Sequence, residues 1–404
     1  MSDLTWLEGG TITSPKGFLA GATYSGIRAY SPDKLDLGIV CSTVPSHVAG
    51  TFTTNKIKSK SVVLDQERVS SGKAQAIIIN SGIANACVGD QGMKDAIEMA
   101  AIAGNHLGID AALVLPSSTG LIGVELPMGL IRVGVQQIEL SDEGGSALAR
   151  AIRTTDTKSK EAAVSFKVGE KTYVLGGIAK GSGMIHPNMA TMLAFITTDA
   201  PIDLSFLRKS LSSVVDSSFN MITVDGDTST NDSVIILANG TAGGDTIEEN
   251  GPAASPFLNA LEELSIYLAK EIASDGEGAT KLIEVTVDGA KTRHDARSAA
   301  RSVASSTLVK SAIHGGDPNW GRIIVALGYS NAEVIEERVA LYINDVCIME
   351  EGRPIPFFKE AIAAIMSQSN VRLRLNLNIG QESSTAWGCD LSEEYVNFNS
   401  TYTT

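Results

Sequence analysis

Short runs of β-branched residues, each bounded by turn residues, recur at irregular intervals along this chain and alternate with amphipathic stretches. The runs predict strands at residues 37–40, 61–64, 75–80, 112–115, 234–238 and 282–287. Residues 371–377 alternate apolar and polar side chains, which indicates a sheet with one solvated face. Residues 339–343 and 346–349 predict a hairpin. Because the pattern lacks the regular βαβ rhythm of a doubly wound fold, it favours an α+β fold with mixed layers.

Three stretches carry apolar residues at helical spacing, at residues 93–107, 207–214 and 257–272. Ser255 followed by Pro256 has the pattern of a helix start, which predicts a cap for the third helix. Core packing is the simplest role for all three apolar stripes.

Charge and cysteine usage exclude several classes of protein. Among the 404 residues, 46 acidic and 32 basic side chains give a net charge of −14, whereas nucleic-acid binders are basic. No apolar run approaches the length of about 20 residues that spans a bilayer. The N-terminus has no secretory signal, and Cys41, Cys87, Cys347 and Cys389 are scattered, so we expect a cytoplasmic protein with reduced thiols.

Common cofactor and metal motifs are absent from the sequence. There is no GxxxxGK[ST], GxGxxG, HExxH or GxSxG pattern, and none of the five histidines is spaced as a pair of metal ligands. Asp225, Asp227 and Asp232 lie close together, but an EF-hand would need glycine at Thr230 and glutamate at Ile236. We therefore expect no metal and no cofactor, and a structural turn at the acidic cluster.

The densest unusual segment is residues 176–193, in which four glycines surround Lys180 and Ala190-Thr191 opens an apolar run. Taken alone, this segment is typical of a glycine-rich turn that leads into a buried strand or helix, with Thr191 as a cap. His186 precedes Thr191 by five residues, and we expect a turn or packing role for it.

Residues 180–193 resemble, nearly letter for letter, the cleavage and nucleophile motif of the ornithine acetyltransferase family, also called bifunctional glutamate N-acetyltransferase. Eight further blocks resemble family motifs in the family's order, at residues 14–18, 80–87, 117–120, 154–157, 223–232, 275–281, 317–322 and 386–391. Together they extend over nearly the whole chain, which makes the resemblance far more specific than any single motif.

The resemblance implies a layered α/β/β/α sandwich of the N-terminal-nucleophile aminopeptidase type, formed jointly by two fragments, residues 1–190 and 191–404. The Thr191 hydroxyl would attack the Ala190 carbonyl, and water would hydrolyse the resulting ester. Thr191 then has a free α-amine with a pKa near 7.7–8.0, which can serve as the general base for its own hydroxyl. Family members associate as two copies of each fragment, and we expect the same assembly here.

The same resemblance assigns the roles of individual residues. The oxyanion hole is assigned to the Thr119 hydroxyl and the Gly120 backbone N–H. Substrate binding is assigned to Thr154, Lys180, Thr191, Glu277, Asn399 and Thr404. Lys180 would pair with the substrate carboxylate and Glu277 with the δ-ammonium of ornithine, while the chain terminus would have to lie over the pocket. On local evidence, residues 117–120 are equally typical of an ordinary turn, and Glu277 of a solvated carboxylate.

The expected activity is transfer of the acetyl group of N-acetylornithine to glutamate through an acetyl ester on Thr191, in arginine biosynthesis. Acetyl-CoA is a possible second donor, which the residues leave open. One alternative keeps the self-cleaving threonine and makes water the acceptor, giving an amidase or aminopeptidase. Another is a non-catalytic binding module whose glycine-rich segments are only turns.

Overall fold

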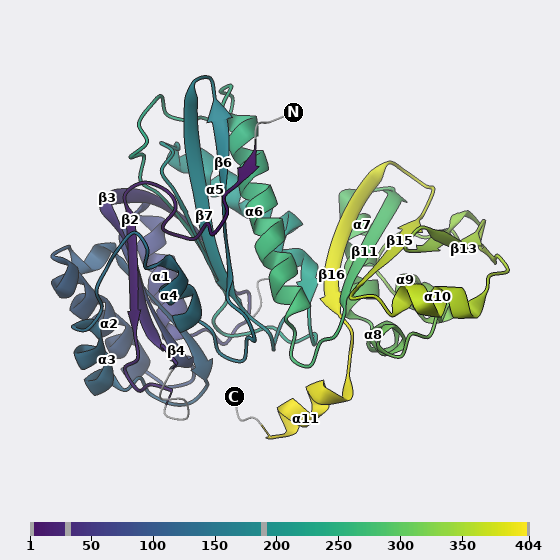
Figure 1. The fold of residues 1–404 in the computed structure, drawn as a ribbon, viewed down its shortest axis with the longest axis horizontal. Coiled ribbons are helices and arrows are strands. Elements are labelled where there is room, and N and C mark those ends of the chain that lie inside the picture. The colour runs from purple at the N-terminus through teal and green to yellow at the C-terminus, as the bar shows by residue number, and fades with distance from the viewer. Residues whose placement is uncertain (1–3, 29–33, 187–191, 402–404) are drawn as a thin grey trace.

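The computed structural model describes residues 4–28, 34–186 and 192–401, which form two lobes (Figure 1). In the described chain, the first lobe contains nine strands in one sheet, in the order β1-β6-β7-β8-β10-β3-β4-β5, with β2 paired to β3. Their bounds are β1 (Thr5–Trp6), β2 (Phe18–Thr23), β3 (Leu37–Phe52), β4 (Lys73–Ile83), β5 (Val114–Leu121), β6 (Lys160–Val168), β7 (Lys171–Lys180), β8 (Leu193–Thr198) and β10 (Ser233–Ala238).

The long strand β3 divides this sheet into two layers that face each other. Its first part pairs with β2 and its last part with β10, and its register with β4 shifts between Cys41 and Ser46. Phe195 of β8 and Ile77 of β4 belong to the same buried cluster, although their strands are separated in the sheet order. The two layers therefore pack face to face and bury a shared apolar core.

Helices cover the outer face of each layer. Ile196 of β8 packs in one cluster with Phe257 of α6 (Ala254–Ser274), and α5 (Leu204–Ser217) belongs to the same side. Ile78 of β4 packs in another cluster with Met99 of α2 (Gln91–Leu107), beside α3 (Met128–Val135). Because neighbouring strand residues point to opposite faces, each layer has one face toward the middle and one toward helices. The α/β/β/α layering that the sequence predicts is confirmed.

The second lobe is a smaller sheet, in the order β14-β13-β12-β15-β11-β16-β9, with α7 packed on β11 and β16. Its strands are β9 (Ile222–Thr223), β11 (Leu282–Ala290), β12 (Ala340–Ile343), β13 (Val346–Glu350), β14 (Arg353–Pro354), β15 (Asn370–Asn376) and β16 (Glu382–Cys389). Its helices are α7 (Arg293–Ser305), α8 (Thr307–His314), α9 (Trp320–Gly328) and α10 (Lys359–Met366). The last helix, α11 (Glu393–Thr401), leaves this lobe and lies beneath the junction of the two lobes (Figure 1).

Most predicted elements are present, including the hairpin of β12 and β13, but three local predictions are wrong. Residues 61–64 belong to helix α1 (Lys60–Ser70), because the Ser59 side chain caps its first turn and α1 packs against β5. Helix α6 begins at Ala254, so Ser255 lies inside it and caps nothing. Residues 112–115 begin as a 3-10 turn, Ala111–Leu113, before β5 starts. The remaining short helix of the first lobe is α4 (Gly145–Ala151).

Segments on both sides of the Ala190–Thr191 bond contribute to the same sheet. Strand β7 precedes the bond, and its second half, residues 175–180, pairs with β8, which follows the bond. Likewise, β3 precedes the bond and pairs with β10. The two predicted fragments, residues 1–190 and 191–404, are therefore interleaved in one fold. Among the helices that the structure describes, none combines the length and apolar character needed to cross a bilayer.

Candidate active site

A cavity of about 200 Å³ lies where β5 and β7 end and α11 approaches the first lobe. Six of the predicted site residues line it: Thr119, Gly120, Thr154, Lys180, Glu277 and Asn399. These residues come from distant parts of the sequence, so the fold brings together a set that the motifs name separately. Thr191 and Thr404 lie outside the described residues, and their roles stay predictions.

Thr119 and Gly120 lie within β5, so residues 117–120 are part of a strand and the ordinary turn is the wrong alternative. Gly120 has a φ of +132°, and a Cβ there would lie 2.1 Å from the carbonyl carbon of Gly82. Only glycine fits this close approach of two backbones. The Asn231 amide group donates to the carbonyl of Ser118 at 2.7 Å, which fixes the strand immediately before Thr119. The backbone that carries the predicted oxyanion hole is thus held rigidly.

Lys180 ends β7 and its side chain enters the cavity while only 2% of the residue is exposed. Its Nζ donates a hydrogen bond to Oγ1 of Thr119 at 3.2 Å. Because the Thr119 oxygen accepts this hydrogen bond, its own O–H is available as a donor to another group. Burial lowers the pKa of the Lys180 ammonium, and the charge of Asp156 works against that shift.

A buried ionic cluster lies directly behind the cavity. The Nζ of Lys160 lies 2.6 Å from Oδ1 of Asp156 and 2.6 Å from Oδ2 of Asp275. Burial alone would raise the pKa of Asp156, but the ammonium groups of Lys160 and Lys180 and the Gly181 N–H bring it below its usual value. The same Asp156 oxygen accepts the Gly181 N–H at 2.7 Å. The cluster therefore ties the residue after Lys180 to the loop that carries Glu277.

These three supporting residues were not assigned a site role from the sequence. Asp156 and Asp275 fall in two of the family blocks, and Lys160 opens β6. Asp156 and Asp275 could have been identified from the sequence, because each lies two residues from a predicted substrate-binding residue, Thr154 or Glu277. Their partner Lys160 could be identified only once the fold had brought residues 156 and 275 together.

Glu277 lies against Gly183, where a Cβ would come within 2.4 Å of both carboxylate oxygens. Its carboxylate accepts a hydrogen bond from the Asn399 side-chain amide at 2.9 Å. Its N–H donates to the carbonyl of Ser182 at 2.8 Å. Glu277 is therefore a cavity-lining carboxylate with defined partners, which argues against the freely solvated alternative.

Helix α11 is held at the cavity by two side chains. Asn399 contacts Glu277, and the Tyr395 hydroxyl donates to Oδ2 of Asp225 at 3.2 Å. Burial and the charge of Asp225 raise the pKa of Tyr395, so this hydroxyl keeps its proton. The C-terminal segment thus lies over the pocket, as expected, up to the last described residue of α11.

The acidic turn forms one wall of the cavity. Asp225 accepts the N–H groups of Met184 at 2.6 Å, Ile185 at 2.8 Å and Asp227 at 3.2 Å. These bonds agree with the structural turn that the sequence predicts. Nδ1 of His186 lies 3.1 Å from Oγ1 of Thr223, which agrees with a packing role for this histidine.

Carboxylates outnumber basic groups around this cavity. Asp225, Asp227 and Glu277 line it, and Lys180 is the basic residue among its described lining residues. Such a site favours a ligand that carries an extra positive charge and one carboxylate that can pair with Lys180.

Comparisons with known proteins agree with these motifs. A model of the ArgJ family matches residues 19–404. The chain belongs to the ArgJ family. Two relatives named arginine biosynthesis bifunctional protein ArgJ, from Symbiobacterium thermophilum and Dehalococcoides mccartyi, are 49% and 47% identical to it. The alignments cover 99% and 100% of this chain and the full length of both relatives.

Membership of the ArgJ family confirms the family that the ordered blocks predict. The protein is therefore an acetyltransferase of arginine biosynthesis, and the non-catalytic binding module is excluded. A solved structure of the arginine biosynthesis bifunctional protein argJ from Bacillus halodurans is 45% identical, with a TM-score of 0.51. The match covers 52% of this chain and 98% of that chain, so the solved chain is about half as long.

Proposed function

We propose that this enzyme transfers the acetyl group of N-acetylornithine to glutamate through an acetyl ester on Thr191. The observation that carries the proposal is the single cavity that brings together Thr119, Gly120, Lys180 and Glu277, each with the chemistry that the reaction needs. Lys180, which lines the cavity, pairs with Leu193 of β8, two residues after Thr191.

The nucleophile is generated by cleavage of the chain. The Thr191 hydroxyl attacks the Ala190 carbonyl, the peptide bond shifts to an ester, and water releases Ala190 as a carboxylate. Both flanks of this segment are anchored, because Asp225 binds the N–H groups of Met184 and Ile185, and Asp232 accepts the Met192 N–H at 2.9 Å. The half-length chain of the Bacillus halodurans relative agrees with two fragments.

In the first half-reaction, the neutral α-amine of Thr191 takes the hydroxyl proton while Oγ attacks the acetyl carbonyl of N-acetylornithine. The proton then passes to the leaving nitrogen, ornithine departs and the acetyl ester remains. In the second half, the amine of glutamate attacks the ester and leaves as N-acetylglutamate, and Thr191 regains its proton. Each step has one proton acceptor, so no histidine is needed.

Thr119 and Gly120 stabilise the oxyanion of both tetrahedral intermediates. One such donor is commonly worth about 10²–10³ in rate. The ammonium of Lys180 strengthens the Thr119 donor, because a hydroxyl that accepts from a cation becomes more polarised. We assign the remaining positive charge of Lys180 to the substrate carboxylate.

Glu277 provides the counter-charge for the δ-ammonium of N-acetylornithine, and Asn399 orients its carboxylate. Thr154 lies in the same cavity, where its N–H and carbonyl are held by Asp156 and Arg28. We retain Thr404 as a further ligand on the strength of the resemblance. The acidic excess of the cavity supports a substrate with a basic side chain.

The description of the relatives as bifunctional supports a second reaction, and we propose acetyl-CoA as its acetyl donor to glutamate. We further propose an assembly of two copies of each fragment, in the cytoplasm, where the unpaired thiols of Cys41, Cys87, Cys347 and Cys389 stay reduced.

The test is to incubate the purified protein with N-acetylornithine and glutamate in the absence of acetyl-CoA. We expect equal amounts of ornithine and N-acetylglutamate, and two polypeptides, residues 1–190 and 191–404, in the mass spectrum of the denatured protein. Thr191→Ala should abolish both the cleavage and the transfer. Thr172→Ala, at an exposed position of β7, is the matched control.

Absence of ornithine release would contradict the transferase. Release of acetate at the same rate with and without glutamate would instead favour the amidase or aminopeptidase alternative. An uncut wild-type chain with full transfer activity would show that Thr191 does not need a free α-amine.

A further inference from the structure

A second cavity, which we call the arginine cavity, lies on the second lobe beside the junction. It has a volume of about 640 Å³ and is lined by Arg293, Arg297 and Arg301 of α7, by His186, and by Tyr329 and other hydroxyl-bearing residues. The proposed reaction uses none of these side chains. Its volume falls in the range of about 300–1,000 Å³ that is common for small-molecule sites.

The three arginines follow one another at four-residue intervals, so they project from one face of α7. At about 1.5 Å of rise per residue, the row extends over about 12 Å. Like charges at this spacing repel each other, which costs stability when no anion lies between them. Burial and the charge of Arg297 lower the pKa of Arg301, and the charge of Asp216 works against that shift.

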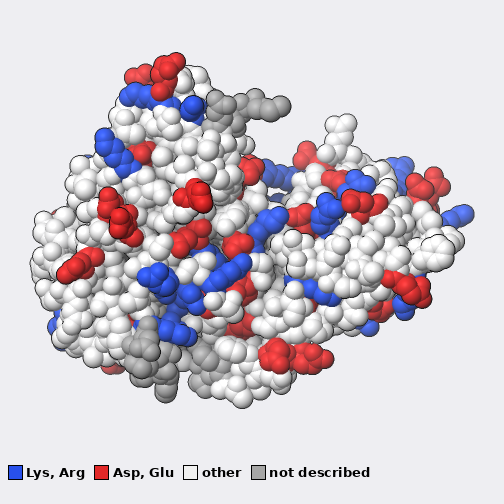
Figure 2. Space-filling model, viewed as in Figure 1, with Lys and Arg blue, Asp and Glu red and all other residues white. Residues whose placement is uncertain are grey.

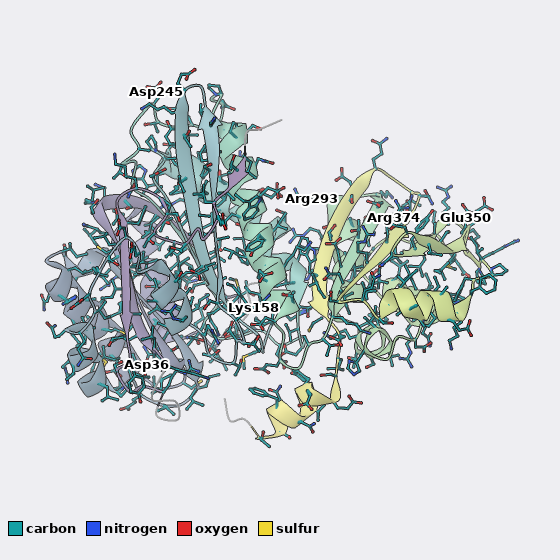
Figure 3. The ribbon with its side chains drawn as sticks, in the orientation of Figure 1. Asp36, Lys158, Asp245, Arg293, Glu350 and Arg374 are labelled. Carbon is teal, nitrogen blue, oxygen red and sulfur yellow. The ribbon has the colours of Figure 1, made fainter. Side chains whose placement is uncertain are left out.

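Acidic side chains are missing from the described lining of this cavity. Asp216 of α5 approaches Arg297 at 3.3 Å, but its side chain is 49% exposed and it does not line the cavity. The whole chain has a net charge of −14, so a concentration of positive charge here is unusual for this protein. Figure 2 shows basic side chains with acidic ones beside them where the lobes meet, and Figure 3 places Arg293 between α6 and β16.

The cavity is also connected to the candidate active site. Nη2 of Arg301 lies 3.3 Å from Nε2 of His186, and Nδ1 of His186 lies 3.1 Å from Oγ1 of Thr223. Arginine can only donate, so Nε2 accepts and Nδ1 carries the proton toward Thr223. Met184, two residues earlier, lines the first cavity. One short segment therefore forms part of both walls and leads toward the predicted cleavage site.

We propose that the arginine cavity is a binding site for a phosphate-bearing ligand. Guanidinium groups match phosphate oxygens with paired N–H donors, and a row of three can neutralise a ligand with several charges. The hydroxyls of the lining supply further donors, and the exposed ring of Tyr329 offers an aromatic face to a base. An amino-acid carboxylate would need only one of these arginines.

Two sources share this chemistry: free phosphate or pyrophosphate, and the phosphorylated nucleotide portion of a coenzyme such as coenzyme A. The second source rests on the proposed use of acetyl-CoA, whereas the first does not. Direct binding measurements separate this proposal from the proposed reaction, because they need no turnover.

The experiment is isothermal titration calorimetry of the full-length protein with phosphate, pyrophosphate, adenosine 3′,5′-bisphosphate and coenzyme A. We expect at least one of these probes to bind. The double variant Arg293→Ala/Arg297→Ala should lower the affinity for that probe by at least about tenfold. The charge-matched control is Arg132→Ala/Arg372→Ala, two exposed arginines that pair with Glu98 and Asp345 elsewhere. It should leave the affinity within about twofold of the wild type.

The pattern of binding distinguishes the sources. Binding of coenzyme A and adenosine 3′,5′-bisphosphate without pyrophosphate assigns a nucleotide, and comparable binding of pyrophosphate assigns free phosphate groups. The proposal is overturned if no probe binds, or if the control variant loses as much affinity as the α7 variant. Circular dichroism of both variants establishes that they are folded, and Arg297→Lys gives an intermediate affinity if the guanidinium fork matters.

Discussion

The two cavities share one short segment of chain, yet they are built in opposite ways. The first is small, has an acidic majority and is shaped by backbone, with glycines pressed together and a buried ionic cluster behind it. The arginine cavity is larger, basic and shaped by side chains that project from a single helix. A site made by backbone contacts has little tolerance for substitution, whereas side chains that project from one helix face can be exchanged one at a time.

The largest effect is expected for Gly120→Ala. The added Cβ would lie 2.1 Å from a Gly82 backbone atom, so the strands must separate and the predicted oxyanion donor moves. We expect acetyl transfer to fall by about 10²-fold or more, measured as kcat with N-acetylornithine. Gly129→Ala is the control, because its Cβ would meet nothing within 4 Å in helix α3. Unchanged kcat in Gly120→Ala would show that this backbone does not need its present geometry.

Lys160→Met tests the buried cluster behind the first cavity. It leaves Asp156 and Asp275 without their shared cation, and an uncompensated buried charge costs about 3–5 kcal/mol. We expect that loss in the free energy of unfolding, measured with urea. Lys291→Met removes an exposed pair with Glu333, which solvent and salt screen, so it should cost far less than Lys160→Met. Equal losses in the two variants would mean that the cluster contributes no more than a surface ion pair.

The same cluster predicts the response to acid. The pKa of Asp156 is lower in the folded protein than in the unfolded chain, so its contribution to stability is present above the ordinary aspartate pKa of about 3.9. That contribution is lost as the pH falls through the lower, folded value. We expect the wild type to lose more stability than Asp156→Asn between about pH 5 and pH 3. Parallel urea midpoints for both proteins over this interval would argue against the predicted linkage.

The sequence predicts the layered fold, because the ordered blocks extend over the whole chain, and six of the residues that those blocks name line one cavity. It does not predict α1, since residues 61–64 have strand-like composition and only the Ser59 cap and packing on β5 make them helical. The Lys160 cluster and the arginine cavity depend on contacts between distant segments. Arg293, Arg297 and Arg301 are visible in the sequence as a spaced row, but the cavity in front of them is not.

A smaller effect is expected for Asn399→Ala, which removes the contact between α11 and Glu277. A hydrogen bond to a charged group is worth about 1.5–3 kcal/mol when buried, and this one is exposed, so we expect KM for N-acetylornithine to rise by up to about tenfold. The neighbouring Ser400→Ala is the control, because its hydroxyl donates to the carbonyl of Asn397 within α11. A change in kcat with constant KM would point to a role for Asn399 in chemistry.

The smallest effect is expected for stability when the row on α7 is shortened. Arg297→Ala loses a partly exposed pair with Asp216 and gains relief from neighbouring positive charge. We expect the free energy of unfolding, measured with urea, to change by less than about 0.5 kcal/mol, in contrast to Lys160→Met. A loss of several kcal/mol would show that the arginine cavity is as rigidly built as the first one.

The pairing of β7 with β8 has a consequence for how the enzyme can be produced. A cut between these strands leaves two polypeptides that each lack partner strands. The first piece made alone would expose the unpaired edges of β7 and β3, and the second those of β8 and β10, so both would tend to aggregate. Genes for the two halves should therefore yield active enzyme when expressed together in one cell, and insoluble protein when expressed in separate cells and mixed afterwards.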